Sequence, residues 1–220
     1  VNGEPLGLVY EISDGGAHGK VVALKAHRDL NLWYRTGLPY DEIHPEDPNN
    51  VGVIARSETD GQENMKAYKQ IPDWKTHYPV AAYVSDLNDE NGNPGWYLPA
   101  IKEVQAMVGW IDGEVLSPDG EAGQEPSEAM KEKRKAINQL IVDNGGNEFY
   151  FYGYDVSFII DQTNAWEADY FNRIYTSTET DYQVHPMVFK FYLRNGWWET
   201  MHVYGDLAGS YGEVRPFLAF

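Results

Sequence analysis

The chain has 220 residues, of which 34 are acidic and 17 are basic, so its formal net charge is −17. A charge of this sign repels phosphate backbones and anionic lipid surfaces, so nucleic acid is not an expected partner. The chain has no cysteine, which excludes disulfides and thiolate metal sites, and it has no run of about 18 apolar residues, so membrane insertion of this segment is not expected.

The first expected element is an N-terminal hairpin. Residues 7–12 and 19–25 are apolar-rich runs, and the Ser, Asp and Gly residues between them tolerate tight turns. Residues 41–64 contain prolines, asparagines and scattered acids with almost no apolar period. This second stretch predicts a long surface connection.

Three helices are expected in the middle of the chain. Apolar residues recur at helical spacing from Val80 to Leu87, behind Pro79, and from Ile101 to Ile111. The third helix should begin after Ser127 as N-cap and stop at Gly145-Gly146. The basic cluster at 131–135 predicts a solvated helix face, and the buried side is expected to hold Met130, Ile137, Leu140 and Ile141. A Gly-, Pro- and Ser-rich stretch at 113–126 predicts a second surface loop.

The chain closes with a strong hairpin signal. Asn195-Gly196 separates two alternating, aromatic-rich runs, and a type I′ turn needs two residues that accept positive φ. Strands at both ends with helices between them predict an α+β fold in which the N- and C-terminal strands meet in one sheet. We expect one domain over residues 1–220.

Aromatic residues near this hairpin are the candidate ligand contacts. Trp197 and Trp198 are adjacent, and adjacent residues of a strand face opposite sides, so one of them should face outward. An exposed indole can stack on a ligand such as a sugar ring, or it can lie beneath a long loop. The candidate binding residues are Trp197, Trp198, Tyr204, Asp206 and Tyr211.

No catalytic residue, metal site or cofactor is expected. The six histidines form neither a His-x-His nor a His-Glu-x-x-His pattern. The oxygen-rich loop at 86–95 fails the calcium-loop register, because Pro94 stands where a glycine is required. Ser210 lies in a Gly-Ser-Tyr-Gly turn that a strand follows, whereas a nucleophile elbow requires a helix there. With 34 acidic residues, a two-carboxylate hydrolase site cannot be told from background.

Six segments, which follow one another along nearly the whole chain, resemble motifs of one protein family. They are residues 7–24, residues 78–87, Gly95-Trp-Tyr-Leu-Pro-Ala100, Ile137-Asn-x-x-Ile141 with Gly145-Gly146, Tyr175-Thr-Ser-Thr-Glu179 and Val214-Arg-Pro-Phe-Leu-Ala-Phe220. Together they resemble the bacterial C-type-lectin-like domains grouped with the C-terminal domain of a collagen-like adhesin, as carried by surface proteins of gut bacteria. More distantly, the chain is similar to the retroelement-diversified binding proteins, whose variable patch would correspond to residues 164–211.

The resemblance implies a C-type-lectin-like fold in which an antiparallel sheet joins the N- and C-terminal hairpins and two to three helices pack against it. It implies a non-catalytic ligand-recognition or adhesion domain, exported to the cell surface or beyond, with a glycan or a protein as ligand. The calcium-dependent sugar signature of animal lectins is missing, so calcium-mediated sugar binding does not carry over. The alternatives are a structural subunit of a surface assembly and an unrecognised hydrolase.

Overall fold

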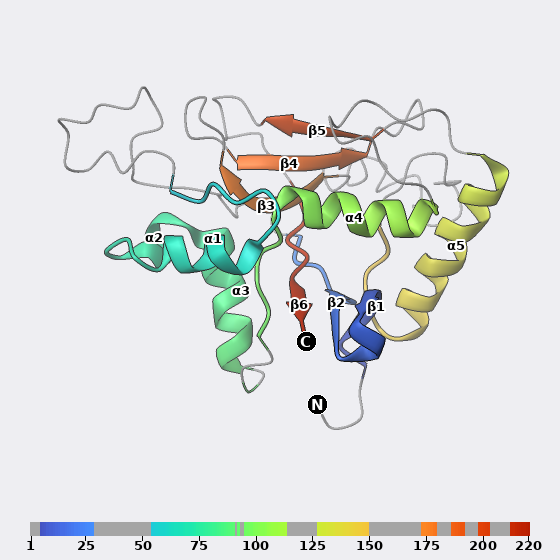
Figure 1. The fold of residues 1–220 in the computed structure, drawn as a ribbon, viewed down its shortest axis with the longest axis horizontal. Coiled ribbons are helices and arrows are strands. Elements are labelled where there is room, and N and C mark those ends of the chain that lie inside the picture. The colour runs from blue at the N-terminus through green and yellow to red at the C-terminus, as the bar shows by residue number, and fades with distance from the viewer. Residues whose placement is uncertain are drawn as a thin grey trace.

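The computed structural model describes residues 5–28, 54–90, 92, 95–113, 127–149, 173–179, 186–191, 198–202 and 212–220, with the strands at 186–191 and 198–202 described through their backbone alone. This part of the chain is α+β, as the sequence predicted (Figure 1). Its strands are β1 (Gly7–Ser13), β2 (His18–Ala23), β3 (Arg173–Glu179), β4 (Pro186–Phe191), β5 (Trp198–His202) and β6 (Phe217–Ala219). Its helices are η1 (Asp14–Gly16), α1 (Gly61–Tyr68), α2 (Trp74–His77), α3 (Pro79–Glu90), α4 (Ile101–Asp112) and α5 (Glu128–Asp143).

The two ends of the chain meet in one three-stranded sheet with the order β1-β2-β6. β2 pairs antiparallel with β1 on one side and with β6 on the other, so that Val22 lies opposite both Leu8 and Phe217. This arrangement confirms the expected N-terminal hairpin and the expected meeting of the terminal strands. We call it the terminal sheet.

The second sheet has the order β3-β4-β5, and the antiparallel pairing of β4 with β5 confirms the second hairpin. Uninterrupted pairing around a two-residue Asn195-Gly196 turn would place Phe191 opposite Thr200, whereas Phe191 lies opposite Trp198. The pairing is therefore displaced by two residues from the register of that tight turn. The connecting residues 192–197 lie outside the described part of the chain.

The two hairpins belong to different sheets, which corrects the expectation of one sheet that joins them. Residues 212–220 link the sheets through backbone hydrogen bonds. Tyr175 N donates to Glu213 O and Glu213 N donates to Arg173 O, at 3.0 and 2.8 Å, before the same segment continues into β6. A short C-terminal segment, rather than the aromatic hairpin, therefore brings the chain ends together.

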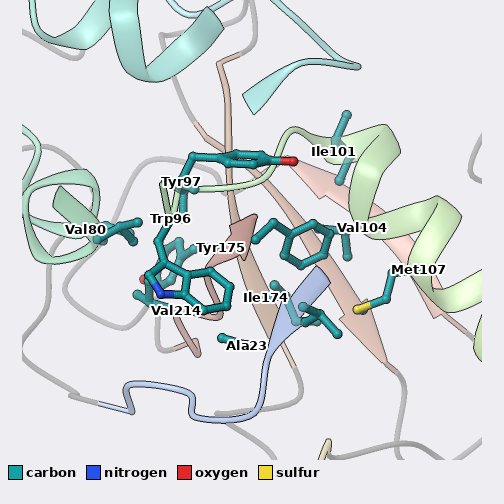
Figure 2. Close-up of a cluster of buried hydrophobic side chains, with 14 of the residues drawn as sticks. Ala23, Val80, Trp96, Tyr97, Ile101, Val104, Met107, Ile174, Tyr175 and Val214 are labelled. Carbon is teal, nitrogen blue, oxygen red and sulfur yellow. The ribbon is translucent and has the colours of Figure 1, made fainter. Parts of the chain in front are cut away.

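Helix α4 lies between the two sheets, in contact with β1 on one side and with β3 and β4 on the other (Figure 1). Figure 2 shows Ile101, Val104 and Met107 of this helix in the cluster of buried side chains that also holds Ile174 and Tyr175. Burying a side chain of this size stabilises the fold by roughly 1.5–3 kcal/mol. The helical period of α4 therefore supplies the centre of the core.

Helix α1 was not expected, because residues 61–64 fall in the stretch predicted as surface connection. Asp60 caps the helix by accepting a hydrogen bond from Glu63 N at 2.9 Å. A side chain at Gly61 would place its Cβ 2.3 Å from the Leu98 carbonyl oxygen, so only glycine allows α1 to approach the chain ahead of α4 so closely. The polar composition of residues 41–64 gave no indication of this contact between α1 and the chain at Leu98.

The ends of α5 agree with the sequence, but its faces do not. Ser127 Oγ accepts from Met130 N, and Gly145 follows the helix with a φ of 73°. Arg134, however, is buried and forms a two-bond ion pair with Asp112 at 2.7 and 2.8 Å, while Leu140 is 48% exposed. The prediction of a solvated basic cluster was wrong for Arg134, because the end of α4 supplies a buried carboxylate opposite it.

Candidate functional site

The residues predicted to bind a ligand lie mostly beyond the described chain. Trp197, Tyr204, Asp206 and Tyr211 fall outside it, and Trp198 is described as the first backbone position of β5. Their proposed role stays a prediction. The described residues, by contrast, show what the other sequence motifs do.

The Thr-Ser-Thr-Glu motif of β3 is a buried hydrogen-bonding centre. Ser177 Oγ accepts from Asn64 Nδ2 at 3.0 Å, and the Ser177 carbonyl accepts from Tyr68 Oη at 2.6 Å. Thr178 Oγ1 accepts from Ile101 N at 3.1 Å and donates to Ser57 O at 2.9 Å. Because Ala100 has no side-chain acceptor, Thr178 supplies from a distant strand the first-turn acceptor that α4 lacks in its own sequence.

Glu179 completes this centre. Its Oε2 accepts from the backbone nitrogens of Ile54 and Ala55 at 2.9 and 3.2 Å, and its own backbone nitrogen donates to Ala55 O. The carboxylate therefore fixes the segment that leads into α1. Its observed partners give it a structural role.

Glu103 is a second buried carboxylate with several partners. Its Oε2 accepts from Gly61 N and Ala100 N at 3.0 and 2.8 Å, while Oε1 accepts from Tyr97 Oη at 2.8 Å and pairs with Lys20 at 3.0 Å. The group joins the starts of α1 and α4 to strand β2. Burial, followed by the charge of Glu103, raises the pKa of the Tyr97 hydroxyl, which keeps it a neutral donor.

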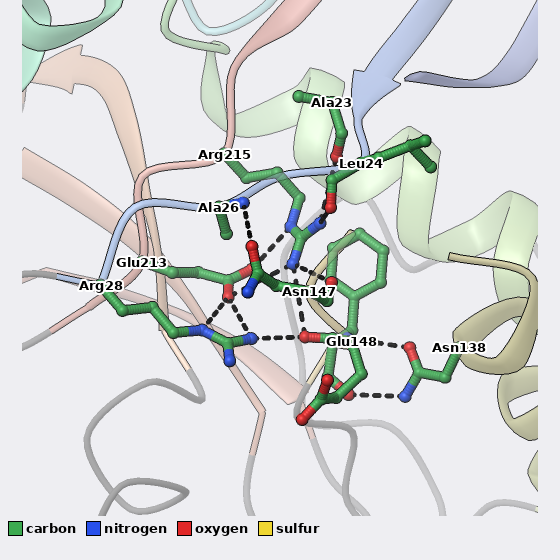
Figure 3. Close-up of polar contacts among 10 residues, drawn as sticks. Ala23, Leu24, Ala26, Arg28, Asn138, Asn147, Glu148, Glu213 and Arg215 are labelled. Atoms are coloured by element: carbon green, nitrogen blue, oxygen red, sulfur yellow. Dashed lines mark hydrogen bonds and ion pairs between the residues drawn. The ribbon is translucent and has the colours of Figure 1, made fainter. Parts of the chain in front are cut away.

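The third polar centre surrounds Arg215, whose side chain is fully buried (Figure 3). Its guanidinium donates to the Glu213 carboxylate at 2.8 Å and to the carbonyls of Ala23 and Leu24, both at 3.1 Å. The same guanidinium lies 4.0 Å from the centroid of the Phe149 ring. Burial lowers the pKa of Arg215 and Glu213 opposes that effect, so these contacts hold a charge that is costly to bury.

Arg28 donates to the other side of the same carboxylate, at 3.0 and 3.1 Å. Glu213 is thus shared by two guanidinium groups, one from the chain after β2 and one from the chain before β6. The Val-Arg-Pro motif therefore clamps the two ends of the chain together.

A cavity of about 370 Å³ lies beside the clamp, where the entry to β1, the end of β2, α3 and the loop after α5 come together. Its volume falls in the range of roughly 300–1,000 Å³ that is typical of small-ligand pockets. Seven of the described lining residues are apolar, namely Pro5, Leu6, Ala23, Leu24, Leu87, Trp96 and Pro216, and Gly145 lines the cavity as well.

Three polar side chains complete the lining of the cavity. Lys25 and Asn144 are exposed at its rim, and the half-buried Tyr83 lies on its wall. The Tyr83 ring packs against His27 with 4.3 Å between the ring centroids, which holds it in place. Burial, and secondarily Glu90, raise the pKa of the Tyr83 hydroxyl, so Tyr83 is neutral at physiological pH.

Sequence reasoning missed this cavity, because its lining comes from separate segments of the chain. Trp96 belongs to the Gly-Trp-Tyr-Leu-Pro motif and Gly145 to the helix stop, but neither local signal predicts that the two residues share a wall. The described residues include no group of three or more His, Cys, Asp or Glu side chains placed to hold a metal ion. None of the helices in the described ranges has the length and apolar character needed to cross a membrane.

No protein-family model, no curated protein and no solved structure matches the chain.

Proposed function

We propose that this chain is a non-catalytic ligand-recognition or adhesion domain with a C-type-lectin-like fold, exported to a bacterial surface. The observation that carries the proposal is the open cavity beside the clamped chain ends, which has both apolar and polar groups in its lining. Small-ligand sites are typically concave and mainly apolar, with a few polar groups that orient the ligand. Tyr83, Lys25 and Asn144 are such groups.

The buried carboxylates support a recognition role over the rival hydrolase. Glu103 and Glu179 accept backbone hydrogen bonds, while Asp112 and Glu213 pair with buried arginines. Groups engaged in this way hold the fold together and are poorly placed to exchange protons with a substrate. A screen of generic glycosidase and esterase substrates tests this point, because turnover that one carboxylate substitution abolishes would favour the hydrolase.

The C-type-lectin-like assignment draws support from the joined chain ends and from α4 packed between the sheets. Three of the six resembling segments contribute to these features, since the Trp-Tyr-Leu-Pro, Thr-Ser-Thr-Glu and Val-Arg-Pro residues take part in the three buried polar centres and the cavity wall. An experimental structure that placed β6 away from β2 would contradict the assignment.

A glycan array tests the predicted aromatic face separately from the cavity. We expect the wild-type chain to bind at least one glycan and Trp198→Ala to bind it at least about tenfold more weakly, since a stacking tryptophan is a typical binding hot spot. Trp110→Ala is the matched control, because Trp110 is 37% exposed on α4. Undiminished binding by Trp198→Ala, or no bound glycan, would argue against the predicted face.

One observation favours the alternative of a structural subunit. Ile12 pairs with Gly19, which exchanges two backbone hydrogen bonds with Phe220, so this row crosses the terminal sheet. Ile12 and Phe220 are 66% and 48% exposed, and Val9, on the same face of the sheet, is 40% exposed. Sedimentation of the wild type and of Ile12→Lys decides whether copies associate here, since a charge in an apolar contact would dissociate them.

A further inference from the structure

The cavity beside the clamped chain ends has a charge pattern that selects among ligands. Among the described residues that line it, Lys25 is the one charged side chain and none is acidic. Lys25 is exposed at the rim, whereas Leu24 and Trp96 are buried in the walls. The cavity therefore combines an apolar interior with a cation at its mouth.

The walls also restrict the shape and polarity of an occupant. Leu6, Leu87 and Trp96 line the cavity, and their side chains are apolar, so a ligand meets apolar groups there rather than hydrogen-bonding ones. A polyol against such walls would leave hydroxyl groups without hydrogen-bond partners, which weakens its binding. A cationic ligand would meet the Lys25 ammonium at the mouth. Sugars and amines are therefore disfavoured in this cavity.

We infer that the cavity binds a small amphiphile with a flat apolar body and a single anionic group, with the body between Leu87 and Trp96 and the anion at Lys25. This inference rests on the proposed recognition function and names the ligand chemistry of one site. Tyr83 and Asn144 add hydrogen-bonding groups beside the anion.

The net charge of −17 does not prevent such binding. At physiological ionic strength the field of exposed charges fades over about 8 Å, so only carboxylates near the cavity, such as Glu90, which acts on Tyr83, oppose the charge of Lys25. Apolar contact supplies most of the affinity, and the lysine selects the anion.

Two dyes with the same aromatic body test the inference by fluorescence titration. 1-Anilinonaphthalene-8-sulfonate carries a sulfonate, and N-phenyl-1-naphthylamine lacks it. We expect each to bind the wild-type chain at one site. Lys25→Gln should weaken the sulfonate dye about 3- to 10-fold, in line with one partly exposed ion pair, and leave the neutral dye unchanged. Lys66→Gln, which removes an exposed lysine on α1, should change neither dye.

Two further variants locate the dye in the cavity. Leu87→Trp fills the cavity from α3, and Asn144→Trp covers its mouth from the exposed end of α5, so both should reduce binding of both dyes at least about tenfold. Circular dichroism and urea midpoints establish that each variant is folded, and Asn144→Trp provides the test if Leu87→Trp unfolds the chain.

The inference is overturned if neither dye binds, if folded filling variants bind normally, or if Lys25→Gln affects both dyes equally. The glycan array reports on Trp198 and not on this cavity. Glycan binding without dye binding would therefore contradict only the inference about the ligand of the cavity. Failure of both experiments would also contradict the proposed recognition function.

Discussion

The dependence of α4 on an acceptor from another strand gives the sharpest prediction, the substitution Thr178→Val. Valine keeps the shape of threonine but removes a hydroxyl that accepts from Ile101 N and donates to Ser57 O. Thr178 is 1% exposed, so water cannot replace these bonds without opening the structure. Leaving a buried donor unmet costs about 1–3 kcal/mol, and losing a helix cap costs about 0.5–2 kcal/mol.

These terms overlap at Ile101 N, and together with the lost bond to Ser57 they predict that the free energy of unfolding falls by about 2–4 kcal/mol. For a chain of this size the thermal midpoint should fall by about 4–16 °C. Urea titrations followed by circular dichroism measure the loss, and hydrogen exchange should show faster exchange of the Ile101 amide. Thr59→Val is the matched control, because Thr59 is exposed in the loop before α1 and should change stability by less than about 0.5 kcal/mol. A loss below about 0.5 kcal/mol for Thr178→Val would refute the shared-cap reasoning.

Three further predictions concern the buried polar centres. Tyr10→Phe should raise the free energy of unfolding by about 0.5–1.5 kcal/mol in urea titrations at pH 7, because the buried Tyr10 hydroxyl has no hydrogen-bond partner among the described residues. A decrease in this free energy of more than about 1 kcal/mol would contradict the prediction. Burial raises the pKa of both Tyr10 and Tyr97 above the unfolded value of about 10. Both hydroxyls therefore stay neutral in the folded state while they ionise in the unfolded state, so the free energy of unfolding is unaffected below pH 10 and declines as pH rises above it. Urea titrations from pH 9 to 11.5 should show this decline in the free energy of unfolding. Tyr10→Phe should reduce the limiting slope of that free energy against pH by about 1.4 kcal/mol per pH unit, and an unchanged slope would contradict the prediction. Arg215→Lys should lower the free energy of unfolding by about 2–4 kcal/mol, since an ammonium cannot reach Glu213 and the carbonyls of Ala23 and Leu24 together. A thermal midpoint within about 2 °C of the wild-type value would refute the role of Arg215 as a clamp.

The sequence was informative wherever a signal is local. Asn195-Gly196 lies between two strands that do pair, and Ser127 and Gly145 do bound a helix, because turns and caps depend on a few neighbouring residues. The apolar period of α4 likewise marked the helix that lies between the sheets. The prediction of a surface connection was wrong at residues 61–64, because the start of α1 is fixed by distant groups, Glu103 and the chain at Leu98.

Composition, periodicity and turn residues by themselves determined the α+β class, the ends of α5 and the existence of both hairpins. Only the tertiary structure decided which sheet each hairpin joins, why Arg134 is buried, and that Thr178 caps a helix far away in the sequence. It also created the cavity, whose walls come from segments that share no local pattern. The physical reason is that turns and helices are chosen by neighbouring dihedral angles, whereas buried polar partners and cavities depend on which distant surfaces the folded chain brings together.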